Sequence, residues 1–245
     1  MTAYVTSRPD ARPDLGRSGV GVVKVSTWDV GTPERQHATV DAIATAWGSR
    51  RWPAVGLLSY TVHIGEDGRT LLHYSQWADE EAYQKFFRGY RDERNAEIDA
   101  AVPGIDRVGI HGYELYRGGV PEGDGRVPGA VVIVEVEFEG PDRERQRAWV
   151  DQVLTALAAD EKSGAGRGGP RDAGISGWFH LGVDGDRVLN YAEWETADAH
   201  RAALAAPGEG IGGDGPEWAA VHAFPGVTGR RVTRYTPGLS ISPGG

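Results

Sequence analysis

Two segments of the sequence carry polar side chains at matching places in otherwise apolar stretches. In residues 59–84 (SYTVHIGEDGRTLLHYSQWADEEAYQ), His63 and His73 flank an Asp-Gly turn and Trp77 follows four residues later. Imidazole and indole N–H groups can hold an oxyanion, and an imidazole can also accept or return a proton. These residue types predict a pocket with a few convergent hydrogen-bonding groups.

The second segment, residues 176–201 (SGWFHLGVDGDRVLNYAEWETADAHR), repeats the pattern with His180, Asn190 and Trp194. An asparagine stands here in place of the second histidine. Its amide N–H is also a donor that can stabilise negative charge.

Turn geometry predicts how these groups are presented. A hairpin centred on Gly68 places His63 and His73 five residues to either side, so we expect them opposite one another on one sheet face. The second segment gives the same geometry, and the even spacing to each tryptophan keeps it on that face. We therefore expect two polar groups and an indole to line a pocket between sheet and helices.

Structural and metal-binding roles compete with this interpretation. A histidine or tryptophan on a strand is often a core residue, although burying such polar groups without partners costs about 1–3 kcal/mol each. His63 and His73 could supply two imidazoles to a metal ion. No carboxylate recurs on that face and Asn190 replaces the second imidazole, so we expect no metal site.

Other catalytic motifs are missing from the sequence. There is no G-x-S-x-G elbow, and GVGVV at 19–23 lacks the G-x-G-x-x-G spacing of a dinucleotide site, so we expect neither NAD nor flavin. Cysteine is absent, which excludes disulfides, thiolate catalysis and cysteine-ligated metals.

Composition limits the partners. The 245 residues are 40% hydrophobic with a net charge of −9 and no basic cluster, which predicts a globular protein that binds neither nucleic acid nor an anionic membrane. No run of 18 apolar residues occurs, and the N-terminal residues lack the apolar region of a secretory signal. We expect a soluble, cytoplasmic protein.

The sequence aligns with itself at two offsets. Residues 20–47 match 130–157 at an offset of 110, and residues 59–84 match 176–201 at an offset of 117. The seven additional residues fall in the glycine-rich segment 161–172, which we expect to be a loop. The sequence thus predicts a tandem repeat of one unit.

Each repeat has the pattern strand, helix, strand, turn, strand, helix, strand, which is typical of an α+β ferredoxin-like βαββαβ unit. Apolar spacing such as Val40, Ile43 and Trp47 lets a helix cover one sheet face. The other face needs a partner, so we expect the two repeats to form an intramolecular dimeric α+β barrel. The predicted boundaries are 19–117 for the first repeat, 118–129 for a linker and 130–236 for the second repeat. We expect the tail, TPGLSISPGG, to be disordered.

At His180, the Asp-Gly turn and VLNYAEW (188–194), the second repeat resembles the antibiotic biosynthesis monooxygenase family of dimeric α+β barrel proteins. The first repeat is similar over the same span, and the resemblance covers most of both repeats. Family members are homodimers of one unit, so the resemblance implies a fused pseudo-dimer, with further self-association open. It also implies oxidation of a phenolic or anthrone-type aromatic polyketide to a quinone or hydroxylated product in secondary-metabolite biosynthesis. The reaction would need no cofactor and would use O2 as co-substrate.

The family resemblance also implies catalytic residues by position. They are the strand Asn or its replacement, the Trp, the upstream His and a helix Tyr: His180, Asn190, Trp194, His63, His73, Trp77 and Tyr83. Neither repeat holds a full set, because His73 stands where Asn is expected and His200 stands where the helix Tyr would be. The strand motif is more complete in the second repeat, which makes that repeat the first choice for activity.

Substrate-binding residues are expected around these groups. Family members offer an arginine from the second helix, for which Arg91 or Arg94 can serve in the first repeat, while the second repeat offers only His222 nearby. His200, at the position of the helix Tyr, is also expected to contact the substrate. Trp178 is suited to form an aromatic wall for a planar substrate. Two other functions stay open: a non-oxidative polyketide-binding or cyclase-like module, and a haem-binding or haem-degrading relative.

Overall fold

The structure is a computed structural model, and it describes the chain except for residues 1–4, 9, 164–169, 207–212, 214 and 245. Two compact units make up the fold. Unit 1 contains residues 1–114 and 235–245, and unit 2 contains residues 115–234. The division falls inside two strands, β5 (Asp106–Gly119) and β9 (Val227–Ser242), each of which contributes to both units.

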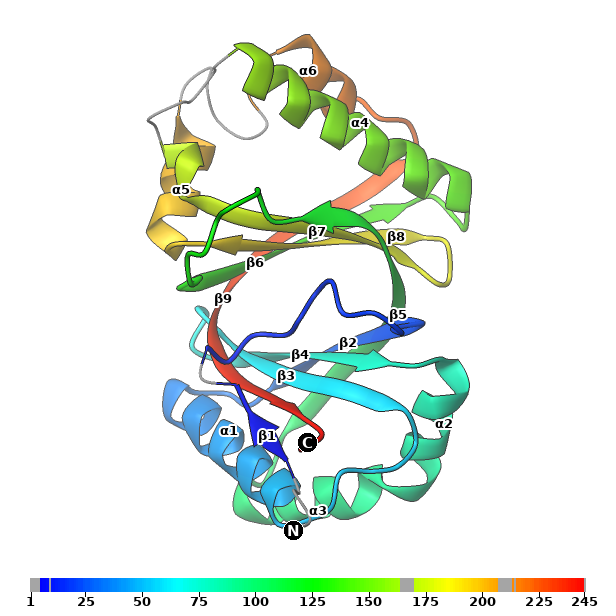
Figure 1. The fold of residues 1–245 in the computed structure, drawn as a ribbon, viewed down its shortest axis with the longest axis vertical. Coiled ribbons are helices and arrows are strands. Elements are labelled where there is room, and N and C mark those ends of the chain that lie inside the picture. Colours follow the sequence, from blue (N-terminus) through cyan, green and yellow to red (C-terminus); the bar gives the residue numbers. More distant parts are fainter. Residues whose placement is uncertain (1–4, 9, 164–169, 207–212, 214, 245) are drawn as a thin grey trace. The chain divides into compact units, whose positions relative to one another are not determined.

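Unit 1 has the ferredoxin-like order of strands and helices, with the second helix divided in two. Its elements are β1 (Thr6–Ser7), β2 (Val22–Asp29), α1 (Pro33–Gly48), β3 (Leu57–Gly65), β4 (Thr70–Trp77), α2 (Glu80–Gly89), α3 (Arg91–Ala101) and the first part of β5 (Asp106–Gly119). The strands pair in the order β1-β9-β3-β4-β2-β5. Helices α1, α2 and α3 cover one face of this sheet (Figure 1).

Unit 2 has the same order of elements. They are β6 (Ala130–Phe138), α4 (Arg143–Ser163), a short 3-10 helix (Pro170–Ala173), β7 (Gly174–Gly182), β8 (Arg187–Trp194), α5 (Ala197–Ala205), α6 (Pro216–His222) and β9 (Val227–Ser242). The sheet order is β5-β7-β8-β6-β9. In the segment 161–172 expected to be a loop, residues 161–163 belong to α4 and residues 170–172 belong to the 3-10 helix, while residues 164–169 lie outside the described residues.

The start of α1 follows from its local sequence and fixes a neighbouring hairpin. Thr32 caps the helix by accepting a hydrogen bond from the Arg35 backbone N–H, and Pro33 occupies the first turn. One turn later, buried Gln36 donates from Nε2 to the carbonyl oxygens of Gly65 and Thr70, at 2.9 and 2.8 Å. The helix thereby holds together the two ends of the β3–β4 hairpin.

The hairpin register differs from the one predicted from the sequence. Gly65 and Thr70 enclose a four-residue turn in which Gly68 adopts φ +66°, so the centre of symmetry falls between Asp67 and Gly68. Asp67 Oδ1 accepts hydrogen bonds from the backbone N–H groups of residues 69 and 70, which stabilises this turn. Because side chains alternate with period two, a shift of one in the pairing moves a residue to the other face.

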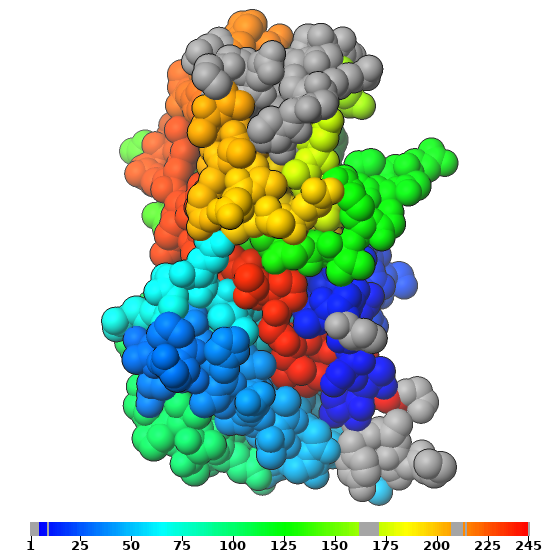
Figure 2. All heavy atoms as spheres, turned by 90° about the vertical axis from the view of Figure 1, so that its left-hand side faces the viewer, coloured from blue at the N-terminus to red at the C-terminus, as the bar shows by residue number. Residues whose placement is uncertain are grey.

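The C-terminal tail is a strand, so the expectation of disorder is wrong. Residues 236–241 pair with β3, with Leu239 opposite Val62, and the tail also pairs with β1. Ser240 and Thr61 share a hydrogen bond between their hydroxyl groups at 2.9 Å. The tail supplies the backbone partner that β3 would otherwise lack, and Figure 2 shows it on the surface beside the N-terminal segment.

No helix in the part of the chain that the structure describes combines the length and apolar character needed to cross a membrane.

Candidate active site

A cavity of about 230 Å³ lies in unit 1 between its sheet and its helices. Strands β2, β3, β4 and β5 supply one wall, and helices α1, α2 and α3 supply the other. Aromatic rings form much of the lining: Trp28, Trp47, Tyr60, Trp77 and Phe86. The cavity has the position predicted from the repeat pattern, but it lies in unit 1, whereas the strand motif favoured the second repeat.

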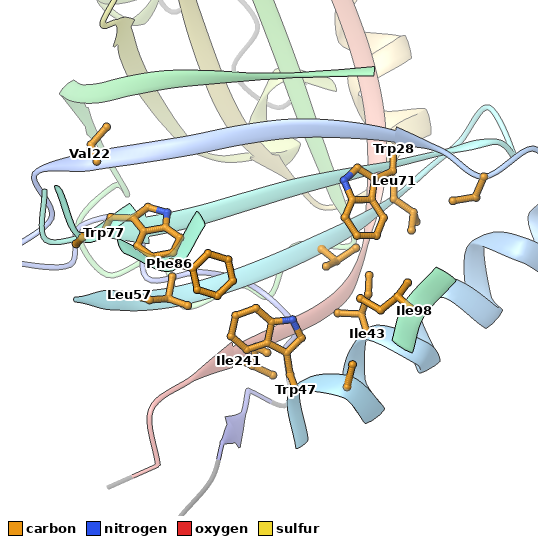
Figure 3. Close-up of a cluster of buried hydrophobic side chains, with 14 residues drawn as sticks. Val22, Trp28, Ile43, Trp47, Leu57, Leu71, Trp77, Phe86, Ile98 and Ile241 are labelled. Carbon is orange, nitrogen blue, oxygen red and sulfur yellow. The ribbon is translucent and has the colours of Figure 1, made fainter. Parts of the chain in front are cut away.

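Stacked aromatic rings form part of the cavity wall. Trp47 stacks on Phe86 with 5.7 Å between ring centroids and 14° between planes, and Trp77 lies 5.2 Å from Phe86. Figure 3 shows these three rings gathered next to Leu57, on the helix side of the strands. Stacked rings of this kind suit the flat face of an aromatic guest.

His73 extends from β4 into this cavity. Its Nδ1 lies 2.6 Å from Tyr60 Oη, and its ring lies 4.2 Å from the Trp28 ring centroid. Nε2 is buried and has no hydrogen-bond partner among the described residues. Burial, followed by the positive charge of Arg107, lowers the pKa of His73 to about 3, so the imidazole is neutral near pH 7.

Trp77 and Tyr83 lie farther along the same wall. The Trp77 indole N–H donates to Ser75 Oγ at 2.9 Å, so this N–H is already engaged within the protein. Tyr83 packs edge-on against Trp77 at 5.4 Å, with Lys24 Nζ 4.6 Å from its ring centroid. Burial raises the pKa of the Tyr83 phenol, which favours its protonated form.

Three arginines contribute positive charge. Arg94 is buried, donates to the backbone oxygens of Tyr90 and Arg51, and lies 4.6 Å from the Trp47 ring. Its Nε is buried without a partner among the described residues, and burial lowers the pKa of its guanidinium.

The other two arginines pair with carboxylates at the edge. Arg91 lies 3.8 Å from the Phe87 ring and bonds Asp92, while Arg107 bonds Asp99. No aspartate or glutamate is among the described residues that line the cavity. The lining is therefore positively charged, which favours an anionic guest.

His63 lies away from this cavity, and the prediction that it shares a face with His73 is wrong. The observed register pairs His63 with Leu72 and His73 with Val62, so the two histidines point to opposite faces of the sheet. His63 is fully buried, and burial lowers its pKa to about 3.

The same correction applies in unit 2. His180 pairs with Leu189 and Asn190 pairs with Phe179, so His180 and Asn190 also occupy opposite faces. His180 Nδ1 lies 3.0 Å from the Trp178 carbonyl oxygen, and burial lowers its pKa to about 4. The Trp178 indole N–H donates within its own strand, to a serine hydroxyl at 3.1 Å.

Asn190 and Trp194 lie on the helix-covered face, as their even spacing predicts. Asn190 Oδ1 is buried and has no partner in the described part of the chain. Trp194 packs edge-on against His200 at 4.8 Å, and His200 Nδ1 accepts a hydrogen bond from Arg234 at 3.1 Å. Burial lowers the pKa of His200 to about 4.

The sequence analysis did not single out Tyr60, Trp28 or Arg107 as site residues. Tyr60 lies opposite Ser75, which makes it the diagonal neighbour of His73. The correct hairpin register would have identified Tyr60 on this face. Trp28 and Arg107 come from strands distant in sequence and carried no comparable signal.

Metal-binding groups are sparse. Within the described ranges, no three histidine, aspartate or glutamate side chains form a group that could hold a metal ion. His73 is the one histidine among the described residues that line the cavity, and its Nε2 is buried.

The sequence matches no protein-family model and no curated protein. Solved structures do show the same fold. An anthrone oxidase-like protein superposes with a TM-score of 0.62 and 16% identity, over 98% of this chain and 97% of the other. A candidate monooxygenase from Fusobacterium nucleatum gives 0.56 and 10%, over 94% and 97%. One from Lactobacillus acidophilus gives 0.52 and 10%, over 89% and 97%.

These structures define the class of fold. The chain has an α+β ferredoxin-like fold shared, over nearly its whole length, with monooxygenase-like proteins. At 10–16% identity, this likeness shows the fold.

Proposed function

We propose that this chain is a monooxygenase that oxidises a phenolic or anthrone-type aromatic polyketide with O2 and no cofactor, and that the cavity of unit 1 is its active site. The fold shared with an anthrone oxidase-like protein supports the class of enzyme. The observation that carries the proposal is the cavity itself, where stacked aromatic rings, arginines and a neutral imidazole surround one space. Such a lining suits a planar substrate that reacts as an anion.

The first task of the site is to stabilise that anion. Arg94 has a buried guanidinium with an unpartnered Nε, and Arg91 and Arg107 add positive charge. Nearby positive charge lowers the pKa of a phenol or an enolised anthrone, so the substrate loses its proton to water at the cavity entrance. His73 lines the same cavity, and its buried Nε2 has no partner in the described part of the chain.

The second task is to let the anion react with O2. The anion gives one electron to O2, and the resulting radical and superoxide combine to form a carbon–oxygen bond. Protonation yields a hydroperoxide, and loss of one water molecule leaves the quinone. One oxygen atom of O2 enters the product and the other leaves as water, so no external reductant is needed.

The matching offsets of the two segments further support a tandem duplication. We propose that the two units form a fused pseudo-dimer, in which one chain takes the place of a homodimer. In this proposal unit 1 oxidises the substrate. Asn190 and Trp194 are the candidate catalytic residues of unit 2.

Oxygen consumption tests the proposed reaction. Chelator-treated protein is incubated with an anthrone under O2 and under argon, and quinone formation is followed by absorbance. We expect one O2 consumed per quinone and no product under argon. Arg94→Met should lower kcat/KM by about 10- to 100-fold, because a hydrogen bond to a charged group is lost. Arg88→Met, on the exposed side of α2, is the matched control.

Other results would favour the alternatives. Binding of the anthrone, seen as quenched tryptophan fluorescence, without O2 consumption would indicate a binding or cyclase-like module. A Soret band on titration with haem, together with activity only in the haem-loaded form, would contradict a cofactor-free reaction.

A further inference from the structure

The two units carry different residues at two neighbouring strand positions. His73 of unit 1 corresponds to Asn190 of unit 2, at an offset of 117 residues. At the same offset, Tyr60 corresponds to Gly177. In both units these residues are diagonal neighbours across the hairpin. Tyr60 lies opposite Ser75, two residues from His73, and Gly177 lies opposite Ala192, two residues from Asn190.

The two strand residues differ in how they present a hydrogen-bond donor. An asparagine amide always carries N–H donors. A neutral imidazole has a single N–H, on either Nδ1 or Nε2, and which nitrogen carries it depends on the hydrogen bond made by the other. A histidine that replaces asparagine as a donor therefore needs a partner that selects its tautomer.

Tyr60 supplies such a partner. Its hydroxyl lies 2.6 Å from His73 Nδ1, and Tyr60 makes no other side-chain hydrogen bond among the described residues. Burial raises the pKa of the Tyr60 phenol, so the hydroxyl keeps its proton. When the phenol donates this proton to Nδ1, the imidazole hydrogen lies on Nε2.

The surroundings hold this arrangement in place. Trp28 packs at 4.2 Å against the His73 ring, and the Tyr60 ring lies nearly parallel to it at 13°. Nε2 has no protein partner in the described part of the chain, yet His73 lines the cavity. In unit 2, a Cβ at Gly177 would lie 3.9 Å from Asn190 Oδ1, so no side chain reaches that amide from the corresponding position.

We propose that Tyr60 is a positioning residue that fixes His73 as the Nε2–H tautomer, so that His73 acts on the substrate oxyanion as a hydrogen-bond donor and not as a base. The proposal deepens the proposed function and rests on it. It also explains why a tyrosine accompanies the histidine, whereas a glycine accompanies the asparagine.

The tautomer can be measured without any turnover. Nitrogen-15 NMR of the histidine side chains, with His73→Asn used to assign the His73 signals, reports which ring nitrogen carries the proton. We expect an unprotonated Nδ1 and a protonated Nε2 in the unaltered protein, and a mixture of tautomers in Tyr60→Phe. A protonated Nδ1 in the unaltered protein would overturn the proposal even if the protein oxidises anthrones.

A double-mutant cycle then tests the functional part. Tyr60→Phe should lower kcat by about tenfold, the effect expected for one weakened hydrogen bond that forms in the transition state. In a His73→Asn background the same change should have little effect, since the amide needs no tautomer partner. Circular dichroism and melting temperature identify any variant that fails to fold.

The outcomes separate the two proposals. An equal loss from Tyr60→Phe in both backgrounds would show that Tyr60 contacts substrate directly or is structural, and would overturn the positioning role. If no variant consumes O2 while NMR shows the expected tautomer, the proposed oxidation fails. The assignment of Tyr60 as the residue that fixes the imidazole would still hold.

Discussion

The hairpins of unit 1 and unit 2 are both held by a glutamine but differ in the side chains on their helix-covered faces. Gln36 bridges two carbonyl oxygens at the end of the β3–β4 hairpin, and Gln146 bridges those of Gly182 and Arg187 at 3.1 and 2.6 Å. Both turns contain a glycine with positive φ. The interactions that set the strand register are thus common to the two units.

The groups that would meet a substrate have diverged. Unit 1 offers Tyr60 and His73, where unit 2 offers Gly177 and Asn190. The Trp77 indole N–H is bonded to a serine hydroxyl, and an alanine stands at the corresponding place beside Trp194. A shared fold therefore preserves the strand positions without preserving the chemistry at them.

The glutamine bridges give the largest expected change in stability. Gln36→Ala removes a buried donor from two carbonyl oxygens, and Gln146→Ala does the same in unit 2. We expect each to lower the free energy of unfolding by about 1–3 kcal/mol, measured by urea denaturation. Gln84→Ala, which removes only an exposed side-chain bond, is the control. A clear loss of stability from only one of the two substitutions would show that the two glutamines do not support their hairpins equally.

Acid pH should destabilise the protein in part through His73, in addition to His63, His180 and His200, whose pKa values burial also lowers. The pKa of His73 is about 3 in the folded protein and about 6.5 in an unfolded chain, so below pH 6.5 the unfolded state binds the additional proton. Stability should therefore fall as the pH falls from 6.5 toward 3. His73→Asn should reduce this slope by up to about 1.4 kcal/mol per pH unit.

The control for this experiment is His37→Asn, on the exposed surface of α1. An unchanged slope in His73→Asn would contradict burial of a neutral imidazole at this position. His63 remains in both variants and contributes its own acid sensitivity.

The smallest expected effect comes from a substitution of Gly177, which stands in unit 2 where Tyr60 stands in unit 1. Gly177→Ala places a Cβ in ordinary contact with Asn190, so we expect a change below about 0.5 kcal/mol in the free energy of unfolding. Gly182→Ala is the contrasting variant, because its Cβ would lie 2.7 Å from Arg187 Cγ and 2.9 Å from the Arg187 carbonyl oxygen. A large loss in Gly177→Ala would show that this position is closely packed.

Several features could be predicted from local sequence. The order of strands and helices in each unit follows from apolar spacing and turn residues, and the position of Trp77 on the face of His73 follows from their even separation. The prediction for His63 was wrong because the turn is centred between Asp67 and Gly68, and not on Gly68. This register places His63 on the opposite face of the sheet from His73. The prediction of a disordered tail was wrong because residues 236–241 pair with β3, although the tail is rich in glycine and proline.

By itself the sequence determined which elements form, since helix caps, turns and hydrophobic periodicity act over a few neighbouring residues. Only the tertiary structure decided which side chains meet in the cavity. Trp28, Trp47 and Arg107 come from three separate elements, and Tyr60 reaches His73 only in the observed register. Such contacts depend on hydrogen bonds and packing between distant segments, which no local pattern encodes.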